Sequence, residues 1–135
     1  MKKPKAIVLD SWPVMAYLED EPSAGKIGTM IADAQDDGTQ LLMSVVNAGE
    51  VWYTLARRRS TKDADETLVW LREVGVRIVN ADWDLTNIAA AFKARGNISY
   101  ADCFAAALAK HNQAALITGD REFEQLEKEV EIVWL

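Results

Sequence analysis

The chain has 135 residues, of which 50% are hydrophobic and 27% are charged. This composition is that of a globular protein and excludes a disordered tail, and the length suits one domain over residues 1–135. The single cysteine, Cys103, excludes an internal disulfide, and the single histidine, His111, excludes a zinc site built from several histidines.

The formal net charge is −6, from 21 acidic and 15 basic side chains. Proteins that bind nucleic acid through bulk charge are basic, so this balance argues against a general nucleic-acid coat protein. It leaves open an enzyme that approaches phosphates through metal ions. No run of about 18 apolar residues occurs, and the first apolar stretch ends early, at Asp10. We therefore expect a cytoplasmic protein with neither a signal peptide nor a membrane partner.

Short apolar runs alternate with longer segments of helical periodicity. The first half predicts a strand at residues 5–9, helices at 12–19 and 23–34, a strand at 40–44, and helices at 47–59 and 61–74. The second half predicts a strand at 77–79, helices at 81–95 and 99–111, a strand at 115–118, a helix at 120–128 and a strand at 131–135.

The alternation of strands and helices is typical of an α/β fold. The predicted strands are apolar without a polar side, as expected where helices cover both faces of a sheet. We therefore predict a three-layer α/β/α sandwich around a mostly parallel central sheet, without linkers or internal repeats.

Four acidic residues fall where strands end or helices begin. Asp10 directly follows the first strand, and Asp120 follows the strand at 115–118 with one glycine between them. Glu50 and Asp102 lie in the first turns of two predicted helices. Because ligands of open α/β sheets bind beyond the carboxyl ends of the strands, we expect these four carboxylates to meet at one edge.

Each of these acids also has a structural interpretation as a helix cap, worth about 1 kcal/mol. The N-cap and capping-box positions fall at Asp10, at Asp120, at Asn47 with Glu50, and at Ser99 with Asp102. Asp102, however, is the only charged residue within the apolar stretch 96–109. A buried carboxylate requires a partner, which favours a functional role there.

Carboxylates gathered at one edge repel one another. Two of them about 5 Å apart repel by roughly 3 kcal/mol at an effective dielectric constant of 20, so protonation or a cation must relieve the repulsion. Oxygen ligands favour Mg²⁺, for which Mn²⁺ can substitute. Such a site binds phosphates and activates water, so we expect phosphodiester hydrolysis.

Four segments carry these acids in order: residues 7–12 (IVLDSW), 44–51 (SVVNAGEV), 99–109 (SYADCFAAALA) and 116–123 (LITGDREF). Together they resemble the PIN-domain nucleases and, within them, the VapC-like toxins of bacterial toxin–antitoxin pairs. The resemblance extends from the first strand to the last. Trp12 departs from the small or aliphatic residue that is usual in this family.

The resemblance implies a parallel sheet flanked by helices and a Mg²⁺-dependent endoribonuclease. It implies metal ligands at Asp10, Glu50, Asp102 and Asp120. Of these, Asp10 and Asp102 match the positions that contact the metal most directly. It also implies that the carboxylates or water are supported by Ser44, Asn47 and Thr118. The implied partners are an RNA substrate, a cognate antitoxin protein that covers the site, and a second copy in a homodimer.

Arg57, Arg58 and Arg59, with Lys62 nearby, form the densest basic cluster. Its structural interpretation is a helix C-terminus, where cations are favoured by the helix dipole. Its functional interpretation, and our prediction, is contact with RNA phosphates beside the acidic site.

Two other functions fit parts of the sequence. The first is a non-catalytic PIN-like module that binds RNA or protein, for which failure to bind Mn²⁺ would be the sign. The second is an aspartyl-phosphate protein, such as a response-regulator domain or a phosphatase. The sequence after Asp10 (Ser11, Trp12, Pro13) and the lack of a lysine directly after the strand at 115–118 disfavour it.

Overall fold

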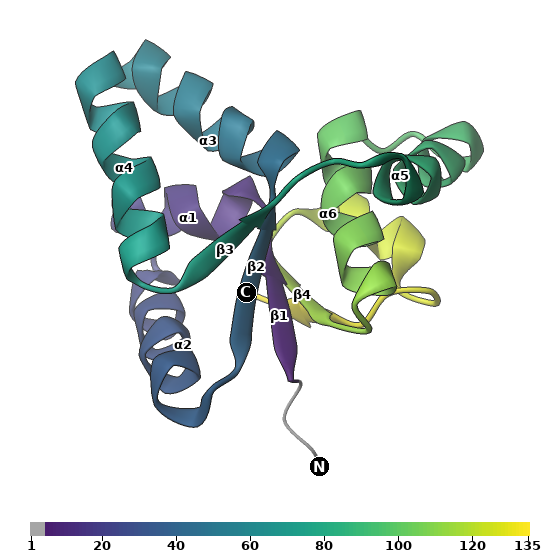
Figure 1. Ribbon diagram of the computed structural model, residues 1–135, viewed down its shortest axis with the longest axis horizontal. Helices are drawn as coiled ribbons and strands as arrows, with labels where there is room; N and C mark the ends of the chain where they lie inside the picture. The colour runs from purple at the N-terminus through teal and green to yellow at the C-terminus, as the bar shows by residue number, and fades with distance from the viewer. Residues whose placement is uncertain (1–4) are drawn as a thin grey trace.

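A five-stranded sheet lies between two layers of helices in the computed structural model, which describes residues 5–135 (Figure 1). The strands are β1 (Ala6–Leu9), β2 (Gln40–Ser44), β3 (Val76–Val79), β4 (Ala115–Thr118) and β5 (Ile132–Trp134). The helices are α1 (Ser11–Leu18), α2 (Ala24–Asp37), α3 (Val45–Arg58), α4 (Thr61–Glu73), α5 (Trp83–Arg95), α6 (Tyr100–His111) and a 3₁₀ helix, η1 (Arg121–Leu126).

The strand order is β3-β2-β1-β4-β5, and each neighbouring pair is parallel. The predicted α/β/α sandwich is confirmed, with a sheet that is wholly rather than mostly parallel. Each connection runs through helices or η1, as parallel pairing requires. In the central strand, Val8 lies between Leu42 of β2 and Leu116 of β4. The carboxyl end of β1, where Asp10 follows, therefore points to the middle of one sheet edge.

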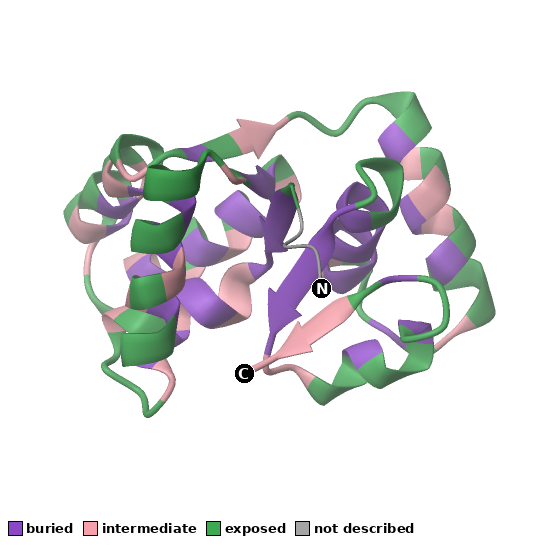
Figure 2. Cartoon of the chain, turned by 90° about the horizontal axis from the view of Figure 1, so that it is seen from below, coloured by how far each residue is buried: buried purple, intermediate pink, exposed green. Residues whose placement is uncertain are grey.

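Neighbouring residues of each strand face two separate apolar layers. Val8 of β1 belongs to a buried cluster with α5, α6 and η1, whereas Ile7 belongs to one with α1, α2, α3 and α4. Figure 2 shows the central strands buried and the edge strand β5 only partly buried. The unbroken apolar strands in the sequence follow from this double cover.

Helix α6 is buried on nearly every side. Its residues 102–109 are all buried, and the helix contacts α3, α5, β1 and β2. This burial was predicted from the apolar run, and it carries Asp102 into the interior at the carboxyl edge of the sheet. Within residues 5–135, no helix has the length and apolar character needed to cross a membrane.

Two predicted elements differ from the structure beside this edge. Helix α3 begins at Val45, two residues earlier than predicted, because Ser44 ends β2 and also caps the helix; its Oγ accepts from the N–H of Val46 at 3.1 Å. Residues 120–128 form η1 rather than an α-helix. Phe123 and Leu126 are both buried, and the three-residue turn of a 3₁₀ helix places them on one side.

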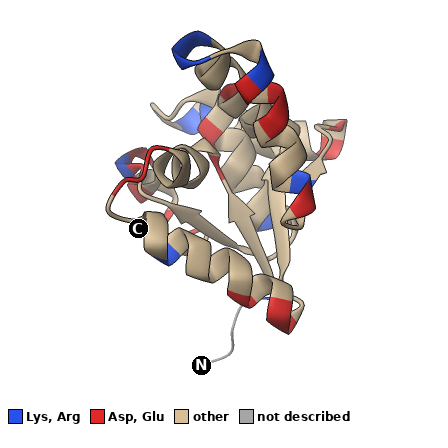
Figure 3. Cartoon of the chain, turned by 90° about the vertical axis from the view of Figure 1, so that its left-hand side faces the viewer, with Lys and Arg blue, Asp and Glu red and all other residues tan. Residues whose placement is uncertain are grey.

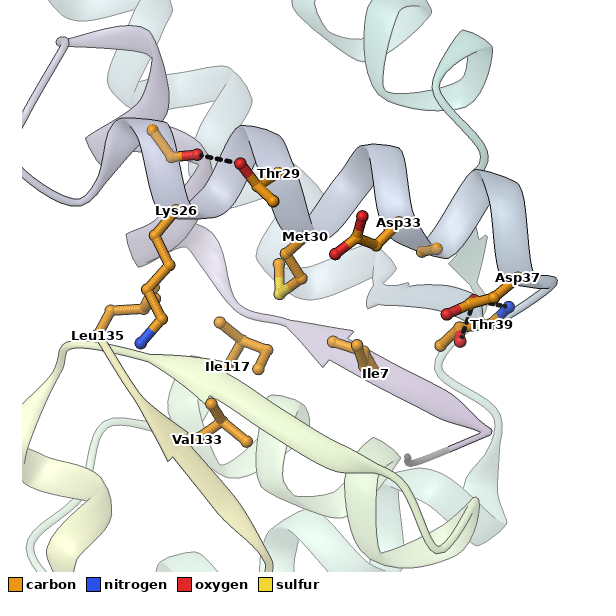
Figure 4. A pocket seen from close by; sticks show the side chains of 12 residues that line it. Ile7, Lys26, Thr29, Met30, Asp33, Asp37, Thr39, Ile117, Val133 and Leu135 are labelled. Atoms are coloured by element: carbon orange, nitrogen blue, oxygen red, sulfur yellow. Dashed lines mark hydrogen bonds between the residues drawn. The ribbon is translucent and has the colours of Figure 1, made fainter. Parts of the chain in front are cut away.

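The sheet face toward α2 is covered incompletely. A pocket of about 480 Å³ lies between α2 and strands β1, β4 and β5, with Ile7, Ile117 and Val133 on its floor and Met30 on the helix side (Figure 4). The chain leaves β4 toward the opposite face, where η1 packs on α6. Helix cover on this face is therefore incomplete over β4, β5 and the part of β1 at Ile7.

Replacing Phe123 with alanine should lower the free energy of unfolding by about 3–5 kcal/mol, because its fully buried ring anchors η1 under α6. Urea unfolding followed by circular dichroism measures this. The neighbouring change Glu124→Ala, at a residue in a surface ion pair, should alter stability by less than about 0.5 kcal/mol. Equal losses in the two variants would contradict this role of the ring.

Candidate active site

A pocket of about 410 Å³ opens at the carboxyl edge of the sheet, between α1, α3, α6 and η1. The four acids picked out in the sequence all line it: Asp10, Glu50, Asp102 and Asp120. Three more acids also line it, namely Glu19, Glu21 and Glu122. The fold thus gathers carboxylates from four separate stretches of the chain around one opening.

Asp10 lies at the bottom of this pocket and is 1% exposed. Thr118 Oγ1 donates a hydrogen bond to Asp10 Oδ2 at 3.0 Å and accepts one from the backbone N–H of Asp120, also at 3.0 Å. Asp10 Oδ1 is buried and has no hydrogen-bond partner among residues 5–135. Asp10 precedes α1 without a side-chain hydrogen bond of ordinary cap geometry, although the nearby backbone N–H of Trp12 offsets a small part of the rise in pKa that burial gives its carboxyl.

Glu50 is held in place by two donors. Its Oε1 accepts from Ser11 Oγ and from Asn47 Nδ2, both at 3.1 Å. Asn47 Nδ2 also donates to the carbonyl oxygen of Ala101 at 3.1 Å, which ties α3 to α6. Ser44, by contrast, caps α3, so its hydroxyl has a structural partner.

Asp102, Asp120 and Glu122 form a compact trio in which one carboxylate oxygen of each residue lies within 4.8 Å of the other two. Ser99 Oγ accepts from the N–H of Asp102 at 3.2 Å, and Asp120 Oδ1 accepts from the N–H of Glu122 at 3.0 Å. Asp120 therefore caps η1 with its carboxylate, whereas Asp102 contributes only its backbone N–H to the cap of α6. Glu122 was missed in the sequence, where an Asp-x-Glu spacing directly after a strand was the available signal.

Burial and mutual repulsion raise the pKa values of the two most buried acids. Burial raises the pKa of Asp10 to about 8, with a further contribution from the charge of Asp120. Burial also raises the pKa of Asp102 to about 9, assisted by its hydrogen bond with Glu122 and by the neighbouring carboxylates. Without a cation, these two acids hold their protons at neutral pH, and a bound cation would favour their ionised forms.

The three arginines of the basic cluster point to different partners. Arg58 lines the pocket and forms an ion pair with Glu19. The Arg57 guanidinium lies 5.1 Å from the ring centroid of Tyr53, and Arg59 donates to a backbone carbonyl at the end of α1 at 3.2 Å. Figure 3 shows the basic segment at the α3–α4 connection, at the top of the view. Only Arg58 of the three lines the acidic pocket.

Trp12 lies against the loop that carries Asp120. A Cβ atom added at Gly119 would lie 2.5 Å from the Trp12 indole, closer than real side chains approach. Glycine at position 119 is therefore required while the ring occupies this place. The contact joins the segment after β1 to the segment after β4.

The family model of the PIN domain matches residues 7–129, which is most of the chain. This chain belongs to the PIN-domain family. No curated protein sequence matches it. The matched residues include all four of the acidic segments.

Solved structures share the fold of this PIN domain over nearly its whole length. VapBC2 from Rickettsia felis, bound to a promoter DNA fragment, matches with a TM-score of 0.77 and 14% identity, covering 96% of this chain and 98% of that chain. VapC20 from Mycobacterium tuberculosis, described as a sarcin–ricin loop cleaving toxin, matches with a TM-score of 0.71 and 18% identity. The match covers 88% of this chain and 93% of that chain. FitAcB from Neisseria gonorrhoeae matches with a TM-score of 0.69 and 19% identity, covering 93% of this chain and 95% of that chain.

The free energy of unfolding of the metal-free PIN domain should fall as pH rises from 5 to 9. The folded protein keeps protons on Asp10 and Asp102 up to pKa values of about 8 and 9, whereas the unfolded chain loses them near 3.8. The folded state binds more protons in this window, so raising the pH favours unfolding. Thermal unfolding in EDTA at several pH values measures this.

Asp102→Asn should remove part of this loss of stability at high pH. At pH 8 we expect the variant to be more stable than the parent by at least about 1.4 kcal/mol, the equivalent of one pKa unit, or roughly 4 °C in Tm. At pH 4, close to the ordinary pKa of 3.8, the unfolded parent also keeps much of this proton, so the two proteins should unfold at nearly the same temperature. A variant that is less stable at both pH values would instead assign the carboxyl of Asp102 a purely structural role.

Proposed function

We propose that the protein is a metal-dependent endoribonuclease that hydrolyses RNA phosphodiester bonds and acts as the toxin of a toxin–antitoxin pair. The observation that carries the proposal is the buried Asp10 Oδ1, which has no partner among residues 5–135 although it lies in a pocket lined by acids. Buried polar atoms are normally paired. A divalent cation is the partner that also relieves the repulsion between carboxylates.

The residues fit such a cation through oxygen atoms alone. The proposed ligands are Asp10, Glu50, Asp102 and Asp120, with Glu122 completing the trio at the outer side. Because all donors are carboxylates, the proposed cofactor is Mg²⁺, with Mn²⁺ as a substitute. The cation, when bound, supplies positive charge for the phosphodiester transition state and makes an attacking water more acidic.

The chain's own contribution is to fix the carboxylates before substrate arrives. Thr118 orients Asp10, while Ser11 and Asn47 orient Glu50, so little reorganisation remains when RNA binds. Asp102 is nearly buried, whereas the trio's other two members lie nearer to solvent. In the proposed reaction, one of these two outer carboxylates accepts the proton of the attacking water.

The proposed partners are an RNA substrate, a cognate antitoxin and a second copy in a homodimer, and the proposed location is the cytoplasm. In support, VapBC from Salmonella typhimurium was solved bound to DNA, and a structure from Klebsiella pneumoniae is a toxin–antitoxin complex. A PIN-like module that binds RNA or protein without cleavage is the alternative, and metal binding separates the two.

Purified protein with Mg²⁺ or Mn²⁺ should cut total cellular RNA into discrete fragments visible on denaturing gels. The fragments should be absent with EDTA, and Asp102→Asn should reduce their rate of formation by about 10²-fold or more. Cleavage that survives both controls would come from a contaminating nuclease. Absence of both cleavage and Mn²⁺ binding would favour the non-catalytic module.

Glu122→Gln should weaken Mn²⁺ binding by about 10-fold or more in calorimetry, because it removes one charge from the trio around Asp102. Glu124→Gln is the matched control, since it removes the same charge two residues away at a side chain paired with Arg121. Equal binding by the two variants would remove Glu122 from the proposed ligand set.

A further inference from the structure

Arg58 is the single basic side chain among the residues that line the acidic pocket. Seven of the other lining residues are acidic, so the pocket as a whole repels a polyanion such as RNA. Positioning contacts to nucleic acid are made to phosphates, most often by arginine and lysine. Apart from the proposed cation, Arg58 is therefore the one charged side chain of residues 5–135 in this pocket lining that attracts a backbone phosphate.

The position of Arg58 on α3 separates it from the carboxylate cluster. Glu50, Thr54 and Arg58 follow one another at intervals of four residues, so they lie along one side of the helix, and all three line the pocket. At a rise of about 1.5 Å per residue, Glu50 and Arg58 begin about 12 Å apart along the helix axis. This separation from the carboxylates suits a phosphate other than the scissile one.

The present partner of Arg58 is Glu19, which also lines the pocket, from the end of α1. The two side chains are 58% and 33% exposed, so this ion pair is screened by water and contributes little to folding. Arginine binds carboxylates and phosphates with the same planar fork of donors. A phosphate can therefore take the place of the Glu19 carboxylate without any change in the fold.

We infer that Arg58 forms a phosphate-binding subsite of this pocket, and that Glu19 occupies the subsite while RNA is absent. The inference rests on the proposed nuclease function and assigns its substrate contact to one residue. The neighbouring arginines have other partners: the guanidinium of Arg57 lies over the ring of Tyr53, and that of Arg59 donates to a backbone carbonyl. Glu19 thereby acts as a built-in competitor of RNA.

Fluorescence anisotropy with a short fluorescein-labelled single-stranded RNA, in EDTA so that no cleavage occurs, tests the subsite. Arg58→Gln should weaken binding about tenfold and reduce the slope of log affinity against log salt by about 0.7, the value for one phosphate contact. Arg95→Gln is the matched control: Arg95 is 56% exposed and paired with Glu129, and it lies outside the pocket lining. It should bind as the parent does.

The role of Glu19 is tested by a second pair of variants. Glu19→Gln should tighten RNA binding about threefold or more, and this gain should vanish in the Arg58→Gln background. Glu21→Gln removes the same charge from the same pocket lining and should give a smaller gain that persists in that background. Equal gains from both variants, persisting without Arg58, would show general repulsion and overturn the inference.

Kinetics separate this inference from the proposed function. Where RNA is cleaved, Arg58→Gln should raise KM and leave kcat nearly unchanged, since the residue contacts a phosphate that does not react. A nuclease whose KM is insensitive to Arg58 would overturn the subsite and leave the nuclease intact. A protein that binds RNA through Arg58 but never cuts it would support the subsite and contradict the nuclease.

Discussion

Asp10 and Asp120 follow two neighbouring parallel strands, so their carboxylates share one edge of the sheet by construction. Helix α6, which packs on the sheet face away from α1 and α2, brings Asp102 to the same edge. The resulting repulsion between carboxylates is the constraint on which the other features of this edge depend. It is relieved by protons on Asp10 and Asp102 in the metal-free protein, and a cation offers the alternative.

Fixed donors on several elements complete this arrangement. The side-chain amide of Asn47 donates to Glu50 and also to the backbone of α6, so the orientation of one carboxylate is coupled to the packing of two helices. Thr118 couples Asp10 to the backbone of Asp120 in the same way. The positions of the acids are therefore set by the tertiary structure, and an isolated helix or loop from this chain would not reproduce them.

The sequence was sufficient to predict the fold class and the meeting of the four acids, because both follow from local patterns and parallel topology. Apolar runs mark the strands, and an acid just beyond a strand of a parallel sheet has one possible edge. The 3₁₀ form of η1 was not predictable from the sequence, since it depends on how the side chains of Phe123 and Leu126 pack in the folded core. The Arg58–Glu19 pair joins residues 39 apart, a distance in sequence at which no helical or strand period gives a signal.

The fit between Trp12 and Gly119 bears on how this sequence can vary. The indole of residue 12 fills the space that any side chain at position 119 would need. A larger residue at 119 therefore requires a smaller residue or another ring position at 12, whereas a smaller residue at 12 remains compatible with glycine at 119. Among relatives of this chain, a large ring at position 12 should accompany glycine at position 119.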